Sequence, residues 1–220
     1  MRSFTVADMP SRTPMQPDLA GSLSERASTF QATHFHEVEG LSGDIRFATA
    51  RCSLGALLVA RTEDGLCAVF LGDDTLALIS TLGRRFPQAQ VRAGGTDLAP
   101  EVAAIQHFVE ESAGAIRTPL VLCGTPFQRR VWRTLSAVPT GTTATYGDIA
   151  RAVKRPSAVR AVATACGSNA LAVIIPCHRI VRKDGQLSGY RWGTARKQAL
   201  LERERRHAFS IRPCSTDTMT

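Results

Sequence analysis

The hydrophobic pattern of this chain changes its period near Gly124, and that change divides the sequence into two structural units. Between residues 45 and 72, short apolar runs alternate with turn signals at residues 53–55 and 63–65. This pattern predicts three strands joined by tight turns, as in an antiparallel meander. After Gly124 the apolar residues recur at helical spacing instead. With 220 residues, the chain is long enough for one domain or two small ones.

The first unit also contains two predicted helices. Residues 73–75 have the composition of a helix N-cap, and Pro87 ends the helix that follows. The apolar residues expected on its inner face are Leu76, Ile79 and Leu82. A second helix fits residues 100–112, and its predicted inward residues are Val102, Ile105, Phe108 and Val109. We therefore expect residues 45–119 to form an α/β structural domain.

Both ends of the chain are predicted to lie outside the two units. Residues 1–44 are rich in Ser, Thr and Pro and show weak periodicity, which predicts a loose N-terminal tail. Residues 208–220 are expected to be frayed. The N-terminal residues lack the apolar core of a secretory signal, and no run approaches the roughly 18 apolar residues of a membrane helix. These features argue against secretion and against membrane insertion.

Residues 120–207 form the second predicted unit, which is mainly helical. A first helix begins at Thr125. Thr145 caps a short helix, and a turn at residues 155–157 leads into another short helix. Two short helices with a tight turn between them predict a helix-turn-helix. A closing amphipathic helix is predicted for residues 195–206.

The net charge of +8 is concentrated in the second unit. Residues 1–120 hold 10 Lys and Arg against 14 Asp and Glu, whereas residues 121–220 hold 17 against 5. A strongly basic segment is typical of proteins that bind a polyanion, and nucleic acid is the commonest one. The alternative is that the basic residues only aid solubility.

The cysteines predict neither a metal site nor a disulfide framework. The six cysteines form no CxxC pair, and the chain is long enough to bury a core without disulfides. We therefore expect a reduced, cytoplasmic protein. His34 and His36 form an HxH pair with no third ligand in view, which is more often a surface pair than a metal site. No metal and no cofactor are expected.

Cys177 is the residue whose surroundings most suggest chemistry. It follows the apolar run LAVII, and a cysteine in such a run is normally a small buried hydrophobic residue. Three neighbours favour a reactive thiol instead. Pro176 fixes the backbone before the sulfur, His178 can act as a base, and Arg179 adds positive potential that favours a thiolate. A Cys–His pair on a DNA-binding scaffold suggests a covalent reaction on nucleic acid.

Residues 175–180, IPCHRI, resemble the PCHR(V/I) signature of the O6-alkylguanine-DNA alkyltransferases. Four further segments resemble that family in its order and spacing, namely GTPFQRRVWRTL, TYGDIA, AVRAVATACGSN and SGYRWG. The resemblance covers about residues 45–206 of this chain. Within the family, these residues resemble the C-terminal half of the bacterial Ada protein and the stand-alone enzymes. Five ordered segments make this resemblance specific. It implies an α+β fold with an N-terminal ribonuclease-H-like antiparallel sheet and a C-terminal winged helix-turn-helix domain.

The resemblance implies a catalytic role for five residues. Cys177 is the alkyl acceptor, and His178 draws its proton through a water molecule. Glu204 orients and polarises His178, and Asn169 braces the turn that carries Cys177. Tyr146 donates to guanine N3, which helps the base leave as a neutral purine. The implied reaction is one irreversible, stoichiometric transfer of an alkyl group from O6-alkylguanine, and from O4-alkylthymine, to the protein's own cysteine.

The resemblance also implies how double-stranded DNA is held by a monomer. The alkylated base is flipped out of the stack, and Arg160 fills the gap. The second helix of the pair lies in the minor groove, so binding is weakly sequence-specific. The other implied DNA-binding residues are Thr145, Ala158, Ala161 and Ala165, whose alanines allow close approach to the backbone. The implied base pocket is formed by Tyr190, Arg191 and main-chain groups of Cys177 and Ile180.

The sequence departs from the family at the domain junction. Residues 121–123 are Val-Leu-Cys, where the family often has Asp-x-Arg. No four-cysteine zinc domain precedes residue 45, so the sensing and activating functions of full-length Ada are not expected. Three other functions compete with this one: a non-catalytic lesion binder, a winged-helix regulator and a Cys–His hydrolase. Cys177 argues against the first, residues 1–120 supply no recognised sensing domain for the second, and adjacent Cys and His are awkward for the third.

Overall fold

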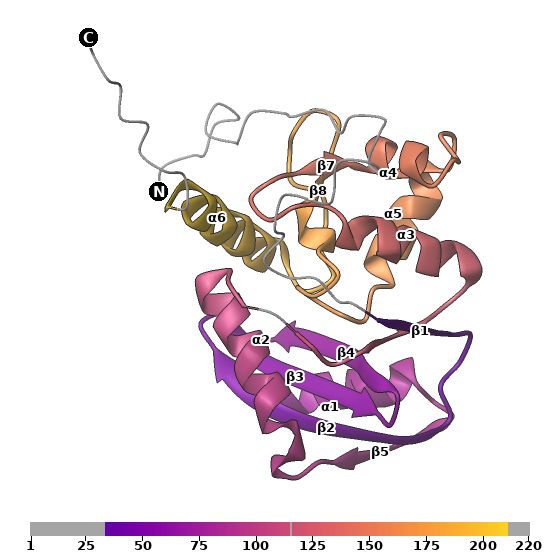
Figure 1. Ribbon diagram of the computed structural model, residues 1–220, viewed down its shortest axis with the longest axis vertical. Helices are drawn as coiled ribbons and strands as arrows, with labels where there is room; N and C mark the ends of the chain where they lie inside the picture. Colours follow the sequence, from indigo (N-terminus) through magenta and orange to yellow (C-terminus); the bar gives the residue numbers. More distant parts are fainter. Residues whose placement is uncertain (1–33, 115, 211–220) are drawn as a thin grey trace.

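A computed structural model describes residues 34–114 and 116–210 of the chain. Within those residues the chain folds into two units, one built on a six-stranded sheet and one built mainly of helices (Figure 1). The elements of the first unit are β1 (Phe35–Val38), β2 (Gly43–Cys52), β3 (Gly55–Thr62), β4 (Gly65–Gly72), α1 (Thr75–Arg85), β5 (Ala89–Ala93), η2 (Thr96–Leu98), α2 (Ala99–Glu111) and β6 (Leu120–Cys123).

The predicted meander is confirmed by β2, β3 and β4, which pair antiparallel in sequence order. The turns need glycine, because Gly55 and Gly65 have positive φ angles of 107° and 140°. A Cβ atom at Gly65 would lie 2.2 Å from the carbonyl oxygen of Pro119. Strands β3 and β4 are buried along nearly their whole length, so both faces of the sheet centre are covered.

The sheet extends beyond the meander, and there the prediction of an antiparallel sheet is wrong. The strand order is β1-β6-β4-β3-β2-β5, and the β1–β6, β4–β6 and β2–β5 pairs are parallel. Parallel neighbours require long crossover connections, and here they are supplied by the meander, α1 and α2. The short strands β5 and β6 carry too few residues to show a period of two. Residues 121–123 of the domain junction lie in β6.

The predicted boundary at residue 45 is also wrong. Strand β1 covers Phe35–Val38 and pairs with β6, so residues 35–44 belong to the sheet domain rather than to a loose tail. The first 33 residues of the predicted tail lie outside the described residues. At the other end, α6 continues to Ser210, two residues beyond the predicted start of fraying, and residues 211–220 are outside the described part.

Helix α1 begins and ends as predicted but presents a different face to the core. The Asp74 carboxylate accepts a hydrogen bond from the backbone N–H of Ala77, which is an N-cap. Leu78 and Leu82, four residues apart, are buried, whereas Leu76 is 74% exposed. The predicted inner face was therefore wrong at Leu76, because the buried stripe follows the i, i+4 spacing from Leu78.

The second unit carries the predicted helix-turn-helix. Its elements are α3 (Pro126–Ser136), β7 (Ala144–Thr145), α4 (Tyr146–Ala152), α5 (Val159–Gly167), η3 (Cys177–Arg179), β8 (Ile180–Val181) and α6 (Thr194–Ser210). Thr125 and Thr145 each form a capping box, with Gln128 and Asp148 respectively. None of the described helices is long and apolar enough to cross a bilayer.

Two features bring segments that are distant in the sequence together, one inside this unit and one between the two units. The parallel pair β7–β8 places Ala144 beside Ile180, so the start of α4 lies next to the end of η3. Helix α6 packs against both η3 and α2, and thereby lies between the two units (Figure 1). The site described below forms where α4, α5, η3 and α6 meet.

Candidate active site

The turn that carries Cys177 is anchored to the sheet domain. The preceding segment pairs with β4, since the backbone N–H of Val69 donates to Ala170 and the N–H of Ala172 donates to Val69. Pro176 then leads into η3, which begins at Cys177. The side chain of Cys177 is only 5% exposed. The sheet therefore fixes the position of a buried sulfur in the helical unit.

Asn169 braces this turn and reaches the sulfur. Its side-chain oxygen accepts from the N–H of Leu171, and its amide nitrogen donates to the carbonyl of Ile175 at 2.9 Å. The same nitrogen lies 3.2 Å from Sγ of Cys177. A hydrogen bond from a neutral amide favours the thiolate over the thiol. The structure thus places Asn169 where the sequence predicted a brace.

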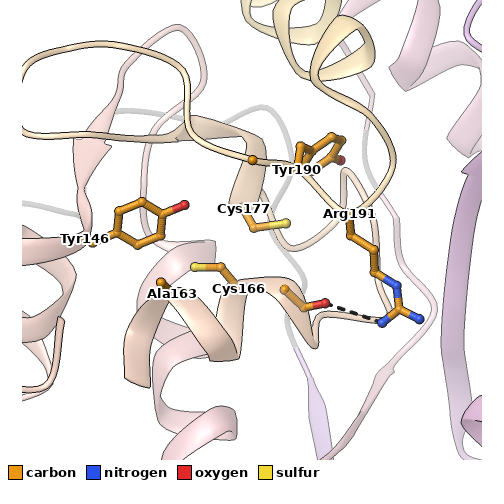
Figure 2. Close-up of a pocket in the computed structure, with 8 residues that line it drawn as sticks. Tyr146, Ala163, Cys166, Cys177, Tyr190 and Arg191 are labelled. Atoms are coloured by element: carbon orange, nitrogen blue, oxygen red, sulfur yellow. Dashed lines mark hydrogen bonds between the residues drawn. The ribbon is translucent and has the colours of Figure 1, made fainter. Parts of the chain in front are cut away.

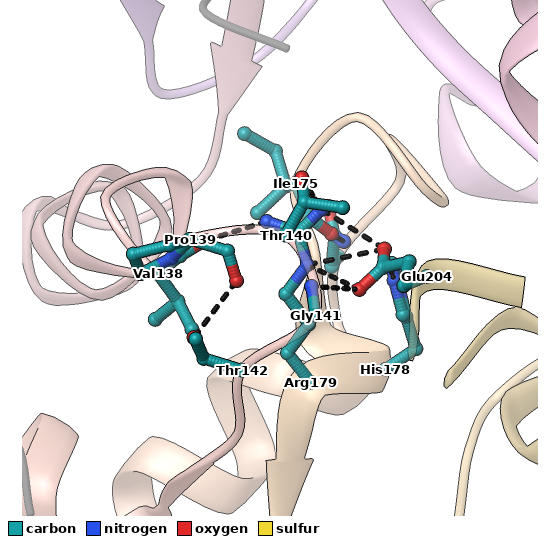
Figure 3. A network of polar contacts seen from close by, with 10 residues as sticks. Val138, Pro139, Thr140, Gly141, Thr142, Ile175, His178, Arg179 and Glu204 are labelled. Carbon is teal, nitrogen blue, oxygen red and sulfur yellow. Dashed lines mark hydrogen bonds and ion pairs between the residues drawn. The ribbon is translucent and has the colours of Figure 1, made fainter. Parts of the chain in front are cut away.

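His178 and Glu204 form a buried pair, shown in Figure 3. Nε2 of His178 lies 2.7 Å from Oε1 of Glu204, and both side chains are almost fully buried. The other ring nitrogen, Nδ1, is buried and has no hydrogen-bond partner among the described residues. Because Glu204 holds Nε2, the nitrogen that remains able to take a proton is Nδ1.

Glu204 also binds Arg179, the residue whose charge was expected to favour a thiolate at Cys177. Both carboxylate oxygens accept from the Arg179 guanidinium at 2.9–3.2 Å, and a further guanidinium N–H donates to Thr140 (Figure 3). Burial would raise the pKa of Glu204, but the charges of His178 and Arg179 outweigh it and lower the pKa to about 2. Arg179 is therefore neutralised by a carboxylate, and the expectation that it activates the sulfur is wrong.

Other groups act on the Cys177 sulfur. Burial raises the pKa of Cys177, and the hydrogen bond from Asn169 and the charges of Lys197 and Arg191 oppose this effect without cancelling it. The resting sulfur is therefore a protonated thiol at neutral pH. Burial also lowers the pKa of His178, in spite of Glu204. A neutral imidazole next to a thiol is able to act as the base that removes its proton.

Cys177 opens onto a pocket of about 250 Å³, shown in Figure 2. Three of the predicted site residues line it together with Cys177, namely Tyr146, Tyr190 and Arg191. The hydroxyl of Tyr146 donates to Ser188 at 2.7 Å. The hydroxyl of Tyr190 is buried without a hydrogen-bond partner among the described residues. The remaining lining residues are Ala163, Cys166, Gly167 and Gly189.

One wall of the pocket is held by residues from both units. The Arg191 guanidinium lies 5.0 Å from the Trp192 ring centre and 5.8 Å from that of Phe70, which belongs to β4. The Phe70 and Trp192 rings are themselves 4.8 Å apart. Ile180, by contrast, does not line the pocket, and its carbonyl accepts hydrogen bonds from Ser188 and Lys197. The structure therefore does not place Ile180 at the pocket wall, where the predicted main-chain contact to a base would require it.

Residues that the sequence analysis missed include Cys166, Ser188 and Lys197. Lys197 had a signal, because Lys197, Leu200 and Glu204 share one stripe of α6 at spacings of three and four residues. All three are buried. Cys166 and Ser188 had no comparable signal, since their positions depend on how α5 and the loop before α6 fold over the sulfur.

The surface of the helix-turn-helix differs from the prediction at one residue. Arg160 and Ala161 are exposed on α5, Ala158 is the half-buried N-cap, and the side chain of Thr145 caps α4. Ala165, however, is only 1% exposed, and its carbonyl accepts from the Trp132 indole at 2.8 Å. It packs inward against α3, so its assignment to a DNA-binding surface is wrong.

The described residues show neither a disulfide nor a metal cluster. Cys52, Cys67, Cys123, Cys166 and Cys177 are free thiols. Over residues 34–114 and 116–210, no group of three or more His, Cys, Asp or Glu is placed to hold a metal ion. His34 and His36 therefore have no third metal ligand within this part of the chain.

Family models match both units of the chain. Residues 126–206 match the DNA binding domain of 6-O-methylguanine DNA methyltransferase, and residues 45–97 match the ribonuclease-like domain of the same family. The second match agrees with the ribonuclease-H-like fold that the sequence resemblance implied.

Individual relatives agree with the family models. The chain is 49% identical over 167 residues to the bifunctional transcriptional activator/DNA repair enzyme Ada of Escherichia coli, covering 73% of this chain and 45% of that protein. It is 36% identical over 151 residues to the inducible methylated-DNA–protein-cysteine methyltransferase of Bacillus subtilis, covering 67% and 83%. The chain thus matches less than half the length of Ada but most of the Bacillus protein.

A solved structure supports the same grouping. The crystal structure of Mycobacterium tuberculosis OGT in complex with DNA has a TM-score of 0.63 and 31% sequence identity to this chain. The alignment covers 74% of this chain and 94% of that one.

Proposed function

Because the chain belongs to the 6-O-methylguanine DNA methyltransferase family, we propose that it repairs DNA by moving an alkyl group from O6 of guanine to Sγ of Cys177. The observation that carries this proposal is the buried Cys177 thiol at the wall of a 250 Å³ pocket, backed by Asn169 and next to the His178–Glu204 pair. The pocket has room for a flipped base, and the thiol is the nucleophile at its wall.

The reaction follows from the protonation states of these groups. Nδ1 of His178 takes the thiol proton, through a bridging water, and Glu204 stabilises the imidazolium that forms. As the Sγ–C bond forms, the bond between that carbon and O6 breaks, and the guanine receives a proton from Tyr146. The products are an alkylated Cys177 and a neutral guanine, with the thiol proton on His178 and the Tyr146 oxygen left without its proton. A thioether is stable and no group in the pocket cleaves it, so each protein molecule reacts once.

The proposed substrate is duplex DNA that carries O6-alkylguanine, and also O4-alkylthymine. The exposed part of α5 supports DNA binding, because Arg160 projects from its first turn among small side chains. The proposal includes base flipping, since the buried sulfur has no access to an atom inside the base stack. It also includes a monomer in the cytoplasm, where Cys177 stays reduced, and a reaction without a cofactor.

Mass spectrometry of the intact protein tests this proposal directly. After incubation with excess duplex that contains O6-methylguanine, we expect one added methyl group per protein, located on the peptide that contains Cys177. Continued turnover, or a methyl group located only on Cys166, would contradict the proposal.

Replacing Arg160 with alanine is expected to impair repair of duplex DNA more than repair of a single strand. Arg160 is exposed on α5 and lies outside the pocket, so the variant leaves the thiol environment intact. A single strand requires no unpairing, whereas flipping from a duplex costs a few kcal/mol. Single-turnover rates on O6-methylguanine in both forms of one oligonucleotide measure the effect. Equal losses on both would show that Arg160 does not act on flipping.

A further inference from the structure

Lys197 is a buried charge that the proposed reaction does not yet explain. Its side chain is fully buried at the start of α6. Its ammonium donates to the hydroxyl of Ser188 at 2.8 Å and to the carbonyl of Ile180. No carboxylate of the described residues forms an ion pair with it. Burying an ammonium group without a counter-ion is costly, so its presence beside the pocket calls for a functional reason.

Ser188 connects this ammonium group to the pocket. The phenol of Tyr146 donates to Oγ of Ser188 at 2.7 Å, and Oγ of Ser188 lies 3.3 Å from the carbonyl oxygen of Ile180. The ammonium of Lys197 donates to the same Oγ. Tyr146 lines the pocket, with its hydroxyl turned to the side on which Cys177 lies (Figure 2). An unbroken chain of hydrogen bonds therefore runs from Lys197 through Ser188 to Tyr146.

We propose that Lys197, Ser188 and Tyr146 form a proton relay that delivers a proton to the guanine as the alkyl group leaves it. This inference rests on the proposed function. The Tyr146 hydroxyl turns from Ser188 to guanine N3 and gives up its proton. The Ser188 hydroxyl then turns from the Ile180 carbonyl to the Tyr146 oxygen and gives it a proton, and the Lys197 ammonium gives its own proton to Ser188. Lys197 ends as a neutral amine, and the thiol proton remains on His178. The alkyl group has moved from O6 to Sγ, and the number of protons is unchanged.

The electrostatic surroundings of Lys197 suit a proton donor. Burial lowers the pKa of Lys197 to about 8, although a thiolate at Cys177 or Cys166 acts in the opposite direction. The titratable groups that face it are those two thiols and His178. An ammonium group with this pKa gives up a proton more readily than an exposed lysine, whose pKa is about 10.4. Loss of the proton also removes the buried charge that has no carboxylate partner.

Ser188→Ala tests the relay, because it removes the connecting hydroxyl and keeps the buried Lys197. The full chain is mixed with duplexes that contain O6-methylguanine or 3-deaza-O6-methylguanine, which has no N3 to protonate. On the first duplex we expect transfer to slow by about tenfold at neutral pH, because general acid catalysis is lost. On the second, the wild type is itself slow and Ser188→Ala causes no further loss. Ser188→Thr, which keeps the hydroxyl, is expected to restore most of the rate.

The dependence on pH gives a second readout that a structural role would not change. The wild-type rate on O6-methylguanine is expected to fall as pH rises through about 8, where Lys197 loses its proton in the free protein. Ser188→Ala is expected to lack this fall. Equal slowing on both duplexes, or an unchanged fall near pH 8 in Ser188→Ala, overturns the relay and leaves the proposed function intact. A wild type that transfers no methyl group at all overturns both.

Discussion

Cys177→Ala is expected to abolish alkyl transfer completely and to leave binding to alkylated duplex nearly unchanged. The pocket contains a second thiol, Cys166, and burial raises the pKa of that thiol strongly, so that, like Cys177, it needs a base to become a thiolate. No side-chain amide among the described residues donates to the Cys166 sulfur, and His178, which pairs with Glu204, belongs to the turn that carries Cys177. A cysteine reacts with an alkyl carbon at a useful rate only as the thiolate and not as the protonated thiol.

The measurement is transfer of radioactive methyl groups from O6-methylguanine DNA to protein, together with DNA binding by fluorescence anisotropy. Cys166→Ala is the matched control, because it removes a buried thiol of the same pocket. We expect that control to accept one methyl group per molecule. Methyl transfer to Cys166 in the Cys177→Ala variant would show that the pocket, rather than the turn with Asn169 and His178, activates a sulfur.

Local signals in the sequence were sufficient for the meander and the helix starts but not for the complete sheet. Asp74, Thr125 and Thr145 were identifiable as caps because a cap depends on residues within three positions of itself. Strands β1, β5 and β6 depend on partners far away in the chain, and each is only four or five residues long. Their pairing is decided by tertiary packing, which no short window of sequence reports.

The site shows the same division between local and distant determinants. Pro176, Cys177 and His178 adjoin one another in the sequence, so their chemistry was visible as a motif. The partner of Arg179 was not visible, because Glu204 reaches it from a helix 25 residues away. Arg179 was therefore expected to favour the Cys177 thiolate. In the structure, the charges that lower the pKa of Cys177 are those of Lys197 and Arg191. The family resemblance supplied Glu204 and Asn169, which composition and spacing alone did not single out.

Glu204→Gln is expected to slow alkyl transfer by about 100-fold and to destabilise the fold by about 3 kcal/mol, since it removes one partner of a buried ion pair. The carboxylate accepts from His178, from Arg179 and from the backbone N–H of Gly141 (Figure 3). Glutamine keeps the shape but leaves the buried guanidinium without a counter-charge. It also removes the negative charge that stabilises protonated His178 during the reaction.

Stability measured against pH distinguishes this ion pair from simple packing. The pKa of Glu204 is about 2 in the folded protein, well below its ordinary value near 4.3. A lowered carboxyl pKa adds stability that is fully present above the unfolded value and is lost as pH falls toward the folded value. The difference in unfolding free energy between wild type and Glu204→Gln is therefore expected to be constant above about pH 5 and to shrink between about pH 4.3 and pH 2.

Glu202→Gln is the matched control for both effects. Glu202 lies two residues earlier on α6, so it points to a different side of the helix and takes no part in the network of Figure 3. We expect this variant to keep the wild-type transfer rate and the wild-type dependence of stability on pH. Denaturant titrations across that pH range, with single-turnover methyl transfer at neutral pH, compare the two variants. If Glu202→Gln slows transfer and Glu204→Gln does not, the carboxylate that polarises His178 has been assigned to the wrong residue.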